Sequence, residues 1–440
     1  MTTAQAQNFA KDTAAAFNNN GFFAMKKLTA SDSLSEIIND SATIQLWDKL
    51  VAPGLQTPLW AAGNAYNAGH FYMLPLQAAF KFKQAAWQQQ FATHFKNFVT
   101  DGRFEVEPVK LYRLQYYYLA SWYLLLAAKQ NYDTATCQQL FSIIYDEIDN
   151  TWNYEPASVW KHPDLQNTSF ENMRSLLLWK LYNVQLPDKI YHRAVTDAEK
   201  YTLAIAANLK AFLIHTEADT FPKNQTLNDI LDFAYIVFNR RVEWNEAGGW
   251  LLQPGYWTQH DDYKYAGFFH KENPQPLPVD DISEDVSHSH RNALWLQSFI
   301  EASANDASLQ AFYNKLLQGL EKQFFLFVLY EPSDIADTYL TFNYMNGWNG
   351  LYRWNYPKAA PNTGFGAYEL SGTLLLGWWT FLGSERIKDV YKELSYRFPI
   401  PDNILAIYQK RTNDSPVKSD TLWYINGWAE LNTKLAAAIR

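Results

Sequence analysis

The sequence predicts an all-α protein built as an (α/α)6-type toroid of helix hairpins. Apolar residues recur at spacings of three and four through most of the chain, which is the period of an amphipathic helix. Strand-like alternation of apolar and polar residues is nearly absent. Segments that start polar and then become strongly apolar return at intervals of about 55 to 60 residues, the length of two helices and two loops.

The helical pattern begins near Ser31 and continues to the end of the chain, with polar breaks between segments. We expect a single domain over residues 1–440, in which residues 1–30 form an N-terminal extension. The clearest predicted helices cover residues 71–99, 109–128, 135–148, 170–182, 197–215, 227–242, 290–302, 308–325, 366–381, 384–396 and 421–439.

The repeat is visible when the polar starts of the most apolar helices are aligned. These starts lie near Pro108, Asn167, Thr226, Val286, Thr363 and Lys418. In a toroid, such helices form an inner layer that is buried on all sides, and their polar first turns face a central opening. The alternative is an open solenoid of helical pairs, but solenoid repeats are usually shorter, roughly 34 to 47 residues. We therefore expect a closed ring.

The composition is unusually aromatic. Phe, Trp and Tyr make up 17% of the residues and charged residues only 19%, against about 25% charged residues in typical domains. Most rings are expected in the core, and the remainder suit the apolar faces of sugar rings. The single cysteine, Cys137, excludes an intramolecular disulfide framework.

Charge and hydropathy limit the partners. A net charge of -8 argues against nucleic acid, and the absence of any unbroken run of about 18 apolar residues argues against membrane insertion. The first residues lack the basic start and apolar run of a signal peptide, which fits either the cytoplasm or a processed chain. The low charge and the many Asn, Gln and aromatic residues favour an extracytoplasmic location. Nothing in the sequence indicates an oligomeric state.

The longest stretch without helical periodicity covers residues 244–285, and we expect it to be an active-site loop. It leads into residues 280–292, which hold four carboxylates, two imidazoles and one guanidinium. A carboxylate such as Asp285 would also cap the helix, whereas a cap needs no imidazole. The spacing matches no zinc signature, so we expect no metal and no other cofactor. The candidate site residues of this segment are Asp281, Glu284, Asp285, His288, His290 and Arg291.

The other polar helix starts and the aromatic stretch 338–362 supply further candidates. If the ring closes, these side chains converge on one cavity. Taken singly, each is more commonly a solvated or packing residue. They are Tyr112, Arg113, Glu171, Asn172, Arg174, Tyr344, Trp348, Arg353, Tyr356, Tyr368, Glu369 and Trp423.

These features resemble the superfamily of alpha/alpha toroids that includes polysaccharide lyases, six-hairpin glycosidases and sugar epimerases. The resemblance covers most of the chain and rests on the architecture, on the SEDVSHSHRN start at residues 283–292, and on Gly-Trp pairs such as those ending at Trp348, Trp378 and Trp428. Toroidal lyases combine an Asn, a His, an Arg and a Tyr. A guanidinium neutralises the uronate carboxylate, a Tyr or His removes the C5 proton, and a Tyr donates to the leaving oxygen. The resemblance implies such roles for Asn172, His288 or His290, Tyr344 or Tyr356, and Arg291 or Arg353.

The expected function is therefore a polysaccharide lyase that acts on a uronic-acid glycan by β-elimination. The arginines near inner helix starts favour it, because planar guanidinium groups match carboxylates. A glycoside hydrolase or sugar epimerase would use paired carboxylates, and a hydrolase needs them about 5 to 9.5 Å apart. Such pairs could come from Asp280, Asp281, Glu284 or Asp285 opposite Glu171 or Glu369. A terpenoid cyclase, suggested by VDDISED at residues 279–285, and a noncatalytic helical scaffold are further alternatives.

Overall fold

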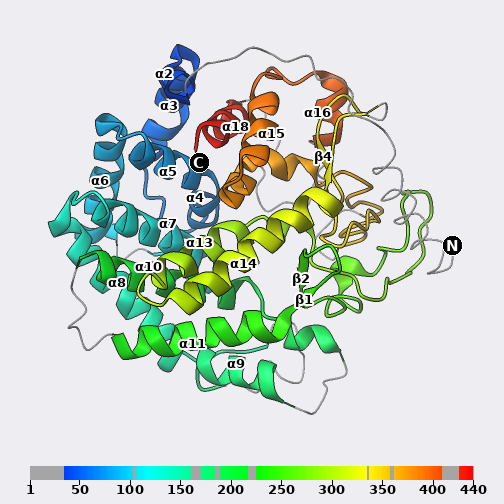
Figure 1. Cartoon of the computed structure of the whole chain (residues 1–440), viewed down its shortest axis with the longest axis horizontal. Helices are drawn as coiled ribbons and strands as arrows, with labels where there is room; N and C mark the ends of the chain where they lie inside the picture. The colour runs from blue at the N-terminus through cyan, green and yellow to red at the C-terminus, as the bar shows by residue number, and fades with distance from the viewer. Residues whose placement is uncertain are drawn as a thin grey trace.

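The computed structural model describes residues 34–102, 106–159, 170–183, 189–216, 224–333, 336–356, 361–408 and 426–439. Over these residues the protein is mostly helical, which confirms the all-α prediction (Figure 1). The predicted N-terminal extension, residues 1–30, and the candidate residue Trp423 lie outside the described residues.

One set of helices is buried along most of its length. α4 and α5 pack against α7, α7 against α10, α10 against α13, and α13 against η6. α18 contacts η5 and η6 and also α5, so the last helix of the set packs against the first part of it. The members are α4 (Ala65–Phe71), α5 (Met73–Lys81), α7 (Lys110–Ala128), α10 (Asp197–His215), α13 (Asn292–Ala302), the 3-10 helices η5 (Ser371–Leu376) and η6 (Trp378–Leu382), and α18 (Trp428–Ala438).

A second set of helices buries one face and flanks the first set. Each carries an apolar stripe on the buried side and polar residues on the other. α6 (Ala85–Thr100) packs against α5, α8 (Thr134–Asn153) against α7, α11 (Asn224–Arg241) against α10, α14 (Ala307–Gln323) against α13, and α15 (Glu385–Ser395) against α18. α3 (Ser41–Gly54) also packs against α18, and α9 (Met173–Tyr182) lies beside α8 and α11 (Figure 1).

Short elements complete the described chain. β1 (Val242–Trp244) pairs antiparallel with β2 (Trp250–Leu252), and β3 (Leu329–Tyr330) with β4 (Leu340–Thr341). The short helices are α2 (Leu34–Asn39), η2 (Ile190–Arg193), η3 (Asp261–Tyr263), α12 (Val286–Ser289), the π-helix η4 (Phe324–Val328) and α16 (Asp402–Tyr408). Between β2 and α12 the chain is irregular apart from η3.

Aromatic rings form much of the core. Trp47 stacks on Trp87 with ring centroids 3.8 Å apart, and Phe324 stacks on Trp379 at 4.3 Å. Such pairs add to the stability that comes from apolar burial. Much of the high aromatic content therefore serves packing.

Two helices that the repeat placed in the inner layer lie elsewhere. α9 and α11 correspond to the predicted starts near Asn167 and Thr226, and both belong to the flanking set, whereas α10 lies between α7 and α13. On α11, Asp232, Tyr235 and Asn239 are exposed at spacings of three and four, so this helix has one solvent face. α10 is buried from Glu199 onward on nearly every side.

The bounds of two predicted helices also differ. Residues 366–381 hold η5 and part of η6 in place of one α-helix, because Gly377 with a φ of 80° lies between them. Residues 71–99 hold α5, α6 and the end of α4, and Lys83 with a φ of 50° breaks the chain between α5 and α6. A left-handed residue cannot continue a right-handed helix.

Candidate active site

Asp285 caps α12 and at the same time binds His288. Its Oδ1 accepts a hydrogen bond from the Ser287 amide at 3.0 Å, as an N-cap does. Its Oδ2 lies 2.8 Å from His288 Nδ1 and accepts from the Tyr263 hydroxyl at 2.9 Å. The Asp285 side chain is fully buried, whereas 27% of the His288 side chain is exposed. The predicted cap therefore also forms a carboxylate–imidazole pair.

The contacts of Asp285 determine the protonation of the pair. Burial alone would raise the pKa of the Asp285 carboxyl, but His288 and the Ser287 hydroxyl hold that pKa well below its ordinary value. Burial lowers the pKa of His288, and the charge of Asp285 outweighs burial so that this pKa is raised. Because an ionised carboxylate only accepts hydrogen bonds, Nδ1 carries a proton and Nε2 is the atom that exchanges one. Nε2 has no hydrogen-bond partner among the described residues.

Arg353 lies beside this pair with one edge of its guanidinium engaged. Its Nε donates to Asp262 Oδ2 at 2.8 Å, and its amide donates to the Asp262 carbonyl at 2.8 Å. Its Cζ lies 5.2 Å from the ring centroids of both Tyr352 and Tyr356. The Arg353 side chain is 34% exposed, and its Nη groups form no hydrogen bond with the described residues. Its φ of 51° is rare for a non-glycine residue, and such conformations gather at functional sites.

Tyr352 connects Arg353 to the imidazole. Its hydroxyl lies 3.5 Å from His288 Nδ1, and its ring lies under the Arg353 guanidinium. Tyr352 itself is 1% exposed. It therefore supports the two groups from the protein side, while His288 and Arg353 keep partly exposed ends.

A chain of buried charges lies near His288, where the charge of Asp197 also raises the His288 pKa. Arg291 donates through Nη1 to Asp197 and places Nη2 2.9 Å from His70 Nε2. Lys200 lies 3.5 Å from Asp197 and 2.7 Å from Glu284. Buried charges of this kind need close partners because they have lost their contact with water. The chain of charges fixes the start of α10 against the segment that carries Asp285 and His288.

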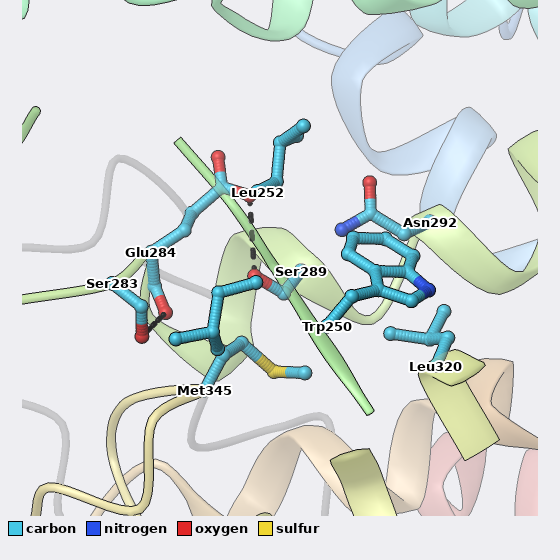
Figure 2. A pocket seen from close by; sticks show the side chains of 9 residues that line it. Trp250, Leu252, Ser283, Glu284, Ser289, Asn292, Leu320 and Met345 are labelled. Atoms are coloured by element: carbon cyan, nitrogen blue, oxygen red, sulfur yellow. Dashed lines mark hydrogen bonds between the residues drawn. The ribbon is translucent and has the colours of Figure 1, made fainter. Parts of the chain in front are cut away.

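Figure 2 shows the residues that line a small cavity next to Glu284. The cavity measures about 10 Å³ and is lined by Ser283, Glu284, Ser289 and Asn292 together with apolar side chains. The Glu284 carboxylate points toward Ser289, whose hydroxyl donates to Oε2 at 3.2 Å (Figure 2). A cavity of this size is close to the minimum for one water molecule. It is therefore too small for a substrate.

The first turn of α10 and the polar face of α4 also contribute to this region, and neither was among the residues predicted from the sequence. Asp197 and Lys200 follow Thr196, which forms a capping box with Glu199. A capping box before an apolar run is a helix-start signal that was present in the sequence. α4 adds Tyr66, whose ring lies 4.7 Å from His70. α4 has only seven residues, which is too short for a helical pattern to show this face in the sequence.

Several predicted site residues do lie in this region. Tyr112 contacts the Tyr66 ring with centroids 5.1 Å apart, which connects the start of α7 to His70 and Arg291. The predicted residues that the structure brings together are Tyr112, Glu284, Asp285, His288, Arg291, Arg353 and Tyr356.

Burial argues against the roles predicted for three of the residues. Tyr344 is 0% exposed, and its hydroxyl donates to the Leu351 carbonyl at 2.6 Å. His290 is 1% exposed between His70 and Trp378, and burial lowers its pKa well below the ordinary value. Arg291 is 3% exposed and has both Nη groups engaged by the protein. These side chains support the site from within.

The candidates at the start of α9 form contacts away from His288. Asn172 accepts from the Ser175 amide at 2.9 Å and donates to the Asn153 carbonyl at 2.9 Å, so it is a helix cap. Arg174 pairs with Asp229 at 2.8 Å. Glu171 is exposed. These residues lie away from His288 because α9 belongs to the flanking set of helices.

The remaining candidates have other structural partners. Arg113 pairs with Glu147 at 2.8 Å, and Glu369 with Lys271 at 2.6 Å. Trp348 donates from Nε1 to the Ala266 carbonyl at 2.6 Å. Tyr368 packs against Tyr330 with centroids 5.5 Å apart, and Asp281 is exposed. None of the described contacts joins these residues to His288.

Comparison with known proteins gave no match to any family model, to any curated protein or to any solved structure. In the described part of the chain, no helix is both long and apolar enough to cross a membrane. Among the same residues, no three His, Cys, Asp or Glu side chains gather as a metal-binding group.

Proposed function

We propose that the protein is a polysaccharide lyase that cleaves a uronic-acid-containing glycan by β-elimination. The observation that carries the proposal is the Asp285–His288 pair, whose Nε2 has no hydrogen-bond partner among the described residues. Tyr352 connects this pair to Arg353, whose side chain is 34% exposed. A buried carboxylate on Nδ1 is the usual way to orient an imidazole that acts as a base.

We also infer that the buried helices form an (α/α)6-type toroid, with α10 as an inner helix in place of α9 and α11. In support, each buried helix packs against the next one in chain order, from α4 and α5 through α7, α10 and α13 to η6. The last helix, α18, contacts both η6 and α5. The first turns of four elements supply side chains to one region, namely Tyr66, Tyr112, Asp197 and His288. Such convergence is typical of inner helices whose N-termini face a common opening.

Each group in the site has a role in β-elimination. The Arg353 guanidinium binds the uronate carboxylate, which makes the neighbouring C5 proton more acidic. His288 Nε2 takes that proton, the electrons of the C5–H bond form the C4–C5 double bond, and the bond from C4 to the leaving oxygen breaks. The Tyr356 hydroxyl gives its proton to that oxygen. Burial and then Asp262 raise the pKa of Tyr356, which keeps it protonated and able to donate.

The same geometry is less suited to hydrolysis. Glycoside hydrolases need a protonated carboxylic acid with a raised pKa near a second carboxylate. Although burial alone would raise the pKa of Asp197 and Asp285, cationic partners hold both well below the ordinary value. The Glu284 carboxylate likewise forms an ion pair with Lys200 at 2.7 Å. Asp197 and Asp285 therefore act as ionised partners of cations.

A screen of uronate and neutral polysaccharides tests the proposal. We expect ultraviolet absorbance from an unsaturated uronate product together with new reducing ends. Reducing ends without this absorbance would show hydrolysis and contradict the proposal. Exchange of C5 hydrogen with deuterated solvent without cleavage would indicate an epimerase, and no change in any glycan would exclude all three reactions.

A further inference from the structure

Asp262 holds Arg353 from inside the protein at two points. Arg353 Nε donates to Asp262 Oδ2 at 2.8 Å, and the Arg353 amide donates to the Asp262 carbonyl at 2.8 Å. Asp262 is only 3% exposed. The backbone contact supports the rare φ of 51° at Arg353, and the side-chain contact fixes the direction of the guanidinium.

The contact between the two side chains uses one atom of each. Asp262 Oδ1 is buried and accepts no hydrogen bond from the described residues. Arg353 Nη1 and Nη2 likewise form no hydrogen bond with them. A guanidinium and a carboxylate frequently pair through two parallel bonds instead. Arg353 therefore keeps the edge formed by Nη1 and Nη2, which can give two such bonds to a second planar group that has two oxygens.

The turn that carries Asp262 also supports the imidazole. The Asp262 amide donates to His260 Nδ1 at 3.1 Å, which caps η3. The next residue, Tyr263, donates from its hydroxyl to Asp285 Oδ2 at 2.9 Å, and Asp285 orients His288. Two consecutive residues of η3 thus contact the guanidinium and the carboxylate–imidazole pair.

The other contacts of the guanidinium do not fix its direction. Arg353 Cζ lies over the rings of Tyr352 and Tyr356, 5.2 Å from each centroid. Contact with a ring face keeps a guanidinium close to the ring but leaves it free to turn within its own plane. Only the bond from Nε to Asp262 opposes that rotation among the described contacts.

We propose that Asp262 is a positioning residue that fixes the Arg353 guanidinium for a free uronate carboxylate and against its methyl ester. This inference rests on the proposed function, because it takes Arg353 to bind the uronate. It adds the form of the uronate that the site accepts. A carboxylate offers a negative charge and two acceptor oxygens to Nη1 and Nη2. A methyl ester has no charge, and its second oxygen carries a methyl group.

Calorimetry on the full chain tests this role in the H288N background, where the ligand is not cleaved. The probes are hexasaccharides of galacturonate, mannuronate and guluronate, each as the free acid and as the methyl ester. At least one free acid should bind more tightly than its ester. D262A should weaken binding of that acid roughly 10- to 150-fold, the value of hydrogen bonds to a charged group. Binding of the ester should not change. A merely structural role would not alter the ratio of the two affinities.

Two further variants separate position from charge. D262N keeps an acceptor oxygen for Arg353 Nε and should retain most of the affinity. D262E keeps the charge but displaces the carboxylate by one methylene group, so it should weaken binding of the free acid as D262A does. D262E also decides the test if D262A does not fold. The matched control is D261N, which removes the same charge from the exposed neighbour on η3 and should bind like its H288N parent.

The positioning role is refuted if no free acid binds more tightly than its ester, or if D262A binds the acid as tightly as D261N. It is also refuted if D262E keeps the affinity and D262N loses it, since charge alone would then explain the effect. The proposed function fails by a different result, namely the absence of unsaturated product when the wild-type protein is given every uronate polymer. Binding of a free uronate that depends on Asp262 would still support the positioning role in that case.

Discussion

At the scale of single residues, Asp285 combines two tasks that the sequence could not separate. Its Oδ1 caps α12 and its Oδ2 orients His288. A substitution at position 288 that keeps the hydrogen bond to Asp285 but removes the imidazole therefore tests the proton transfer without loss of the contact that supports the fold. Asn at position 288 meets this need, because its amide nitrogen can take the place of Nδ1.

We expect H288N to lower kcat by roughly a hundredfold to ten-thousandfold, the range for loss of a general base. The melting temperature should change little, since the buried Asp285 carboxylate keeps a donor. H290N is the comparison variant. His290 is 1% exposed, so its replacement should lower the melting temperature and spare the turnover of the folded fraction. Full turnover in H288N would exclude His288 as the base.

The pH dependence of kcat/KM tests the same pair. A base must be neutral, so activity should rise as pH increases through the pKa of His288. Burial lowers this pKa and Asp285 raises it to a net value above the ordinary one. D285N removes the raising charge, and the acidic limb of the profile should therefore move to lower pH. The exposed residue Asp281 provides the control, since D281N should leave the limb in place. If the acidic limb of D285N lies at the same pH as that of the wild type, His288 is not the base.

At the scale of elements, the sequence predicted most helices but not their layers. The capping signals were local and readable, as at Thr196 and Glu199 before α10. Whether a helix is flanked on one side or on all sides depends on distant parts of the chain. The start of α9 shows the consequence, because Asn172 was predicted as a catalytic residue and lies at a cap.

We expect N172A to affect stability alone. Loss of an N-cap costs about 0.5 to 2 kcal/mol, which denaturant unfolding can measure. Turnover per folded molecule should match the wild type. N172D keeps a capping oxygen and should retain most of the stability. A large fall in kcat for N172A with normal folding would return Asn172 to the active site.

At the scale of the whole molecule, α18 joins the end of the described chain to its beginning. It packs against α5, α3 and α2 as well as against η5, η6 and α15. The Thr380 hydroxyl donates to the Ala436 carbonyl at 2.8 Å, which ties η6 to α18. Loss of packing in α18 should therefore destabilise the first helices of the described chain as well as the last ones.

Leu435 on α18 is 0% exposed, and we expect L435A to lower the free energy of unfolding by about 2 to 5 kcal/mol. L326A is the control, because Leu326 is 56% exposed and surface changes usually stay within about 0.5 kcal/mol. Hydrogen exchange in L435A should speed up in α5 as well as in α18. Unchanged exchange in α5 would argue against a ring closed by these two helices.

The sequence alone determined the all-α class, the positions of most helices and the segment that carries Asp285 and His288. These features depend on local periodicity and on runs of polar residues, which are properties of neighbours in the chain. The tertiary structure decided which helices lie inside and which candidates meet. His70 and Arg291, for example, are 221 residues apart in sequence and lie 2.9 Å apart in the fold. Burial and pairing of this kind arise only when distant segments pack together, so no local pattern contains them.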